Sequence, residues 1–149
     1  MTTAFSLHQR LQDDCEIIGY FDLCQLLVMN DCQYPWFILV PEIPDICEIY
    51  QLMPEQQQQL VMESSVLAKI LADGFQADKM NIAAIGNLVP QLHLHHVVRY
   101  KGDMAWPGPI WGKFPPVVYD EMQLKQRIVQ VQNWLLAASE QVGFTKIRF

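Results

Sequence analysis

Apolar residues gather in five short stretches that predict β-strands. The stretches are residues 16–20, 24–29, 36–40, 79–86 and 91–100. The first two lie only three residues apart, which is typical of a β-hairpin. The third is continuously apolar and ends at Pro41, which indicates a strand buried on both faces.

Two longer segments have helical spacing. Residues 54–73 start at Pro54, a favoured first helical position, and end at Asp73-Gly74. One face of this segment carries Leu60, Ser64, Leu67 and Leu71. Residues 120–142 follow the N-cap Asp120 and present a second apolar face, which Gly143 closes.

These elements predict an α+β fold: an antiparallel sheet of about five strands, one long packing helix and a C-terminal helix. We expect a single domain over residues 1–149, with its core at about 15–112 and the last helix at about 120–142. The N-terminal residues are expected to be peripheral, with a short helix capped by Ser6 that ends near Asp13. Residues 144–149 alternate and could add an edge strand.

The strand predicted at 91–100 holds three of the four histidines. Side chains alternate across a strand, so His96 should face away from His93 and His95. The His93 face carries Gln91, His93, His95, Val97 and Arg99. Two imidazoles flanked by an amide and a guanidinium can bind an anion and can also attack one.

Three interpretations of these histidines remain open. They could be ordinary polar residues of a sheet, satisfied by their neighbours. They could bind a metal ion, but a closed zinc site needs about four ligands, His8 is distant in sequence and no Cys-x-x-Cys pair is present. They could carry nucleophilic catalysis, in which one imidazole attacks phosphorus and its neighbour handles charge or protons.

Residues 91–97 read Gln-Leu-His-Leu-His-His-Val and resemble the His-x-His-x-His-x-x signature of the histidine triad (HIT) superfamily, with Gln91 at the first triad position. The apolar run 36–41, which ends in proline, resembles a strand of that family. Residues 104–108, Met-Ala-Trp-Pro-Gly, resemble its Trp-Pro segment after the motif. The likeness covers about residues 15–112.

The resemblance implies a nucleotide hydrolase or transferase that acts on an α-phosphate through a nucleotidyl-histidine. His93 would be the nucleophile, and His95 would hydrogen-bond the phosphate or the leaving group. The resemblance also implies a homodimer and a nucleotide-type substrate, and it requires no metal or other cofactor.

Other residues are candidates for contacts to the nucleotide. By the resemblance, Asn30 or its neighbour Asp31 is placed to contact the ribose, and Asn87 the phosphate. Arg99 falls close to the histidines and could meet a phosphate, and Trp106 could shelter the site. Gln91 can still donate and accept hydrogen bonds, and a backbone carbonyl can orient His93, so we expect activity to survive this substitution.

The chain also departs from the family pattern in the loop before residue 91, which is short and lacks a hydroxyl group. A nucleotide-binding or regulatory protein that has lost turnover is therefore an alternative function. A divalent-metal protein that uses His93 and His95 is a third.

The formal net charge is −6, which argues against binding to nucleic acid or to an anionic membrane surface. No apolar run approaches the ~18 residues of a membrane span. The four cysteines have no metal-site spacing and follow no export signal, so we expect free thiols and a cytoplasmic protein. Acidic residues dominate the first half of the chain, where Arg10 is the only base before Lys69.

Overall fold

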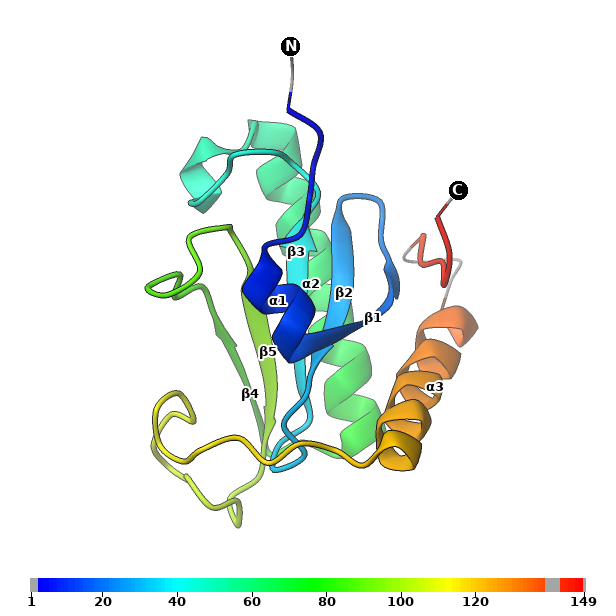
Figure 1. The fold of residues 1–149 in the computed structure, drawn as a ribbon. Helices are drawn as coiled ribbons and strands as arrows, with labels where there is room; N and C mark the ends of the chain where they lie inside the picture. Colours follow the sequence, from blue (N-terminus) through cyan, green and yellow to red (C-terminus); the bar gives the residue numbers. More distant parts are fainter. Residues whose placement is uncertain (1–2, 139–142, 149) are drawn as a thin grey trace.

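Five strands form one antiparallel sheet in the computed structural model, which describes residues 3–138 and 143–148. Their order across the sheet is β1-β2-β3-β5-β4. The elements are α1 (Gln9–Asp14), β1 (Cys15–Tyr20), β2 (Cys24–Met29), β3 (Trp36–Pro41), a 3-10 turn (Ile49–Gln51), α2 (Pro54–Phe75), β4 (Lys79–Ala83), β5 (Leu94–Arg99) and α3 (Glu121–Ala137). The predicted α+β fold, with its sheet, long packing helix and C-terminal helix, is confirmed (Figure 1).

The histidine strand β5 lies inside the sheet, between β3 and β4, although β4 precedes it directly in the chain. All six of its residues are buried. A strand enclosed in this way gives its side chains fixed directions, because hydrogen bonds on both edges and packing on both faces hold the backbone.

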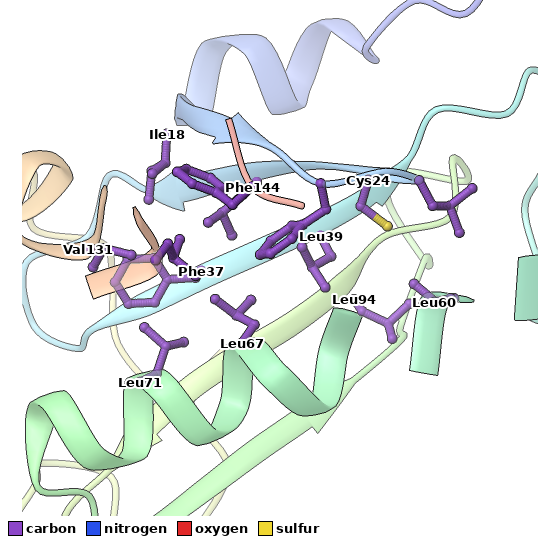
Figure 2. Close-up of a cluster of buried hydrophobic side chains, with 14 of the residues drawn as sticks. Ile18, Cys24, Phe37, Leu39, Leu60, Leu67, Leu71, Leu94, Val131 and Phe144 are labelled. Carbon is purple, nitrogen blue, oxygen red and sulfur yellow. The ribbon is translucent and has the colours of Figure 1, made fainter. Parts of the chain in front are cut away.

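The main core lies between the sheet and α2. Leu67 and Leu71 of α2 point toward Phe37 of β3 in Figure 2, and all three side chains are fully buried. α3 lies beside α2 in Figure 1 and adds Val131 and Leu135 to the same cluster. The apolar stripe predicted for the long helix is therefore the face that packs on the sheet.

α1 packs on the opposite face of the sheet. Its Leu11 belongs to a second buried cluster with Leu27, Ile38 and Val40, which alternate with the side chains that face α2. Figure 1 shows α1 in front of the sheet and α2 behind it. The short α1 covers only part of this face, and the face also carries His93 and His95.

Two predicted helix boundaries are wrong. α2 continues through Gly74 to Phe75 and ends at Gln76, which adopts the left-handed conformation with φ of 53°. Gly74 is a contact position: a Cβ there would lie 2.5 Å from the Trp134 ring of α3. The N-cap of α1 is His8 rather than Ser6, and its side chain accepts a hydrogen bond from the Arg10 N–H at 3.1 Å.

The observed strands and the C-terminal elements also differ from their predicted boundaries. β4 ends at Ala83 rather than residue 86, and β5 spans Leu94–Arg99 rather than 91–100, so that Gln91 and His93 lie just before the strand. α3 ends at Ala137, and the part of its prediction at 139–142 lies outside the described residues. The tail makes a single antiparallel bridge, between Thr145 and Tyr20, in place of an edge strand. In the described part of the chain, no helix has the length and apolar character to cross a membrane.

Candidate active site

A pocket of about 660 Å³ opens on the α1 side of the sheet. Its walls come from five parts of the chain: α1, the end of β2, β3, the β4–β5 connection with β5, and the loop after β5. Among its lining side chains are Asn30, Trp36, Asn87, His93, His95 and Trp111. The pocket thus gathers polar and aromatic groups around two histidines, which is typical of small-molecule sites.

His93 and His95 face the pocket side by side, with ring centroids 4.9 Å apart, and each residue is only 6% exposed. His96 points the other way, where its Nε2 lies 2.7 Å from Ser64 Oγ of α2. The strand alternation expected from the sequence is therefore present, and it separates His96 from the pocket.

The His93 ring is oriented by the backbone just before β5. Its Nδ1 lies 2.7 Å from the backbone carbonyl oxygen of Gln91. A carbonyl oxygen can only accept, so Nδ1 carries the hydrogen and Nε2 presents a lone pair. Burial lowers the pKa of His93, an effect that the Gln91 hydrogen bond partly opposes. A neutral imidazole with a free Nε2 is the form that can attack an electrophile.

The His95 ring has the opposite tautomer. Trp36 Nε1–H donates to His95 Nδ1 at 2.9 Å. The indole nitrogen is a donor only, so His95 Nδ1 accepts and its Nε2 carries the hydrogen. Burial, with smaller contributions from His93 and His96, lowers the pKa of His95 to about 3. His95 is therefore a neutral hydrogen-bond donor at physiological pH.

Together the two rings supply a nucleophilic nitrogen and an N–H donor in one pocket. Trp111 packs edge-on against His95, with ring centroids 5.4 Å apart, and helps to fix that ring. An electrophilic centre bound near His93 Nε2 would have an oxygen or a leaving group within reach of a donor.

Replacement of Trp36 by phenylalanine should remove the hydrogen bond that fixes the tautomer of His95. The variant keeps an aromatic ring but loses the N–H donor, so His95 can protonate at Nδ1 more easily. Because the indole hydrogen bond favours the neutral ring, its loss should raise the His95 pKa and shift the acid limb of the pH–rate profile to higher pH. We expect kcat to fall by about tenfold.

Trp106→Phe is the matched control, because Trp106 lies outside the pocket and its ring packs over Arg99, 5.5 Å away. Its pH profile should match that of the wild type. An unchanged profile in Trp36→Phe would contradict the tautomer assignment.

Two of the predicted nucleotide contacts line the pocket with the histidines. Asn87 lies in the β4–β5 connection. Asn30 follows β2, and its Oδ1 accepts a hydrogen bond from the Tyr119 N–H at 2.9 Å. Its side-chain NH₂ is thus the group that can donate to a ligand. The structure brings both amides to the histidines, as the sequence predicts.

Arg99 does not line the pocket. It lies near the end of β5, where only 1% of its side chain is exposed, and its guanidinium donates to Asp103, Asn81 and the Gly108 carbonyl at 2.7–3.0 Å. The predicted contact from Arg99 to a phosphate is therefore wrong, because Asp103, Asn81 and the Gly108 carbonyl occupy the N–H donors of its guanidinium. Face alternation placed Arg99 correctly, but its distance along the strand removes it from the site.

Trp106 and Gln91 also lie outside the pocket. Trp106 packs on Arg99 in the loop after β5. The side chain of Gln91 bonds to the N-terminal segment, and only its backbone carbonyl serves the histidines. The predicted ligand contacts of these two side chains are replaced by contacts within the protein.

The sequence reasoning missed the roles of Trp36 and α1. Trp36 pairs with Val97 and Ile38 with His95, so Trp36 and His95 share a face of the sheet. The register of β3 against β5 would have revealed this. The N-terminal residues are not peripheral, because Arg10, Leu11, Asp13 and Asp14 form one wall of the pocket.

A closed metal site at the histidine pair would need further ligands. Residues 3–138 and 143–148 contain no group of three or more His, Cys, Asp or Glu side chains arranged to hold a metal ion. The histidine pair alone does not complete a closed site.

Comparison with known proteins gives consistent matches. The family described as HIT domain matches residues 10–102. A histidine triad protein from Marinobacter aquaeolei VT8 is 52% identical, with a TM-score of 0.88 over 91% of this chain and 98% of that one. A histidine triad protein from Bradyrhizobium japonicum is 44% identical, with a TM-score of 0.85 over 88% and 98% of the two chains. No curated protein matches the sequence.

Proposed function

The chain belongs to the HIT domain family, and from this membership and the site geometry we propose that it is a nucleotide hydrolase or nucleotidyltransferase. It would act on the α-phosphate of a nucleotide ester, anhydride or amidate through a nucleotidyl-histidine. The observation that carries the proposal is the pair of opposite tautomers, with a free Nε2 on His93 beside an Nε2–H on His95.

In the first step, the lone pair of His93 Nε2 forms a bond to the α-phosphorus, and the bond from phosphorus to the leaving group breaks. The ring becomes positively charged and keeps its Nδ1–H, which donates to the Gln91 carbonyl at 2.7 Å. This hydrogen bond should strengthen as the ring gains charge. In the second step, water attacks phosphorus, the P–N bond breaks, and mononucleotide, a proton and neutral His93 are released.

His95 would stabilise charge without giving up a proton. Its Nε2–H can hydrogen-bond a phosphoryl oxygen or the leaving atom, but loss of that proton would leave an anionic imidazole. With a pKa of about 3, the ring also carries no additional proton at neutral pH. A leaving group that is stable as an anion can therefore depart directly, whereas the amine of a phosphoramidate must take up a proton from solvent before its bond to phosphorus breaks.

The charge of the pocket favours a particular kind of substrate. Among the described residues that line it, Arg10 is the only cation, against the carboxylates Asp13, Asp14 and Asp31. Such a wall repels long polyphosphates, which carry several negative charges. We therefore propose that nucleoside phosphoramidates, with a single charged phosphate, are preferred over dinucleoside polyphosphates.

The experiment is intact-protein mass measurement after brief mixing with adenosine and guanosine phosphoramidates and dinucleoside polyphosphates, with product release followed in parallel. We expect a nucleotidyl adduct or mononucleotide release, and a kcat/KM about tenfold higher for the phosphoramidates at low salt. Higher ionic strength should narrow this difference. Tight nucleotide binding with neither adduct nor release would favour the alternative, a binding or regulatory protein.

We further propose a homodimer in a reducing, cytoplasmic environment. β4 is an end strand of the sheet, and Ile82 and Ile85 are partly exposed at or beside it, so a second chain could pair there. Cys15 and Cys24 are buried free thiols, and burial raises the pKa of Cys15 to about 12. Inert buried thiols of this kind suit a reducing compartment.

A further inference from the structure

Gln91, which occupies the first triad position, connects the backbone just before β5 to the N-terminal segment at residues 3–8. Its side-chain Nε2 donates to the Ser6 carbonyl at 2.9 Å, and its Oε1 accepts from the His8 N–H at 2.8 Å. The amide thus bonds two alternate residues of the segment, as a neighbouring strand would. Its backbone carbonyl meanwhile orients His93.

The N-terminal segment determines where α1 begins. His8 is the N-cap of α1, and its side chain accepts from the Arg10 N–H at 3.1 Å. The residue that bonds to Gln91 is therefore the one that caps the helix. Figure 1 shows the segment leading directly into α1 in front of the sheet. A shift of the segment would move the first turn of the helix with it.

α1 forms a wall of the pocket through Arg10, Leu11 and Asp14. Its C-terminal end lies beside Asn30, whose backbone N–H donates to the Asp14 carbonyl at 2.9 Å. Since Asn30 is the proposed ribose contact, this wall lies on the nucleoside side of the site. Leu11 anchors the wall in the sheet, but its first turn depends on residues 3–8.

We propose that Gln91 is a positioning residue that holds the N-terminal segment and the α1 wall against the nucleoside-binding side of the pocket. The inference rests on the proposed function. Gln91 would therefore have two separate roles. Its backbone carbonyl orients the nucleophile, and its side chain supports nucleotide binding through the N-terminal segment. Loss of the side chain should weaken nucleotide binding and leave the chemistry at His93 intact.

The test is Gln91→Leu, which has a similar size and keeps the backbone carbonyl but removes both side-chain hydrogen bonds. Amide hydrogen exchange in residues 3–14 should become at least about tenfold faster. The Kd values for AMP and GMP should rise by about tenfold, while kcat at saturating substrate stays within about threefold. Gln91→Glu should give an intermediate exchange rate, because a carboxylate accepts from His8 but cannot donate to Ser6.

Gln132→Leu is the matched control. Gln132 Nε2 also donates to a backbone carbonyl, that of Ile18 at 2.8 Å, but from α3 on another side of the fold. This variant should leave exchange in residues 3–14 and both Kd values unchanged.

Unchanged exchange in Gln91→Leu, or a fall in kcat with no rise in Kd, would overturn the inference. The second result would assign the side chain to His93 instead. Wild-type protein that binds neither AMP nor GMP would overturn the proposed function, and hydrogen exchange alone would then decide whether Gln91 holds the segment.

Discussion

Replacement of His93 by alanine is expected to abolish the nucleotidyl adduct and to lower kcat by at least about 10⁴-fold. The only group that we assign to attack is the Nε2 of this ring, whose orientation depends on a single hydrogen bond to the Gln91 carbonyl. The neighbouring ring cannot take over, because His95 Nδ1 accepts from Trp36 and its Nε2 carries a hydrogen. The measurements are intact mass after rapid mixing and kcat with the best phosphoramidate.

His96→Ala is the control for this experiment. His96 is fully buried on the opposite face, where its Nδ1 bonds to the Leu94 carbonyl at 3.1 Å and its Nε2 to Ser64. We expect this variant to lose stability but to keep kcat within about threefold, since no atom of the ring reaches the pocket. Comparable losses of kcat in the two variants would contradict the strand register and the catalytic assignment together.

Alternation along one strand was sufficient to predict that His93 and His95 would lie together. This succeeds because β5 is paired on both edges without a bulge, and because His93, one residue before the strand, continues the alternation toward the face of His95. The same local logic predicted the hairpin of β1 and β2 and the packing face of α2. It failed at Gly74, where a ring from α3, about 60 residues away in the sequence, explains the glycine better than a helix end does.

The hydrogen-bond partners of the polar groups in the site could not be predicted from the local sequence pattern. Trp36 lies 59 residues from His95, and Ser6 lies 85 residues from Gln91. Which donor meets which acceptor depends on strand order and on the path of the N-terminal segment, and neither leaves a periodic signal. Position in the motif therefore selected His93 as the nucleophile that we propose, but it assigned Gln91 to the ligand, whereas the Gln91 side chain bonds to the N-terminal segment.

The largest loss of stability is expected from Arg99→Met. The Arg99–Asp103 pair is nearly buried, with side-chain exposures of 1% and 8%, and two N–H groups of the guanidinium meet the carboxylate at 2.8 and 3.0 Å. Removal of one partner leaves a buried charge without compensation, which costs about 3–5 kcal/mol of unfolding free energy. Arg99 also bonds to the Gly108 carbonyl, so the loop that carries Trp111 should loosen. Urea unfolding of wild type and variant measures the difference.

The pH dependence of this loss identifies its cause. The Arg99 hydrogen bond is the main reason that the pKa of Asp103 is below its usual value. A carboxyl group with a lowered folded-state pKa contributes stability above its unfolded pKa and loses it as pH falls through the folded value. The gap in stability between wild type and Arg99→Met should therefore be widest near neutral pH and shrink in acid.

Arg99→Met combined with Asp103→Asn should recover part of the loss, because the second change removes the unpaired charge. A constant gap from neutral to acid pH would mean that lost packing, not the ion pair, accounts for the effect.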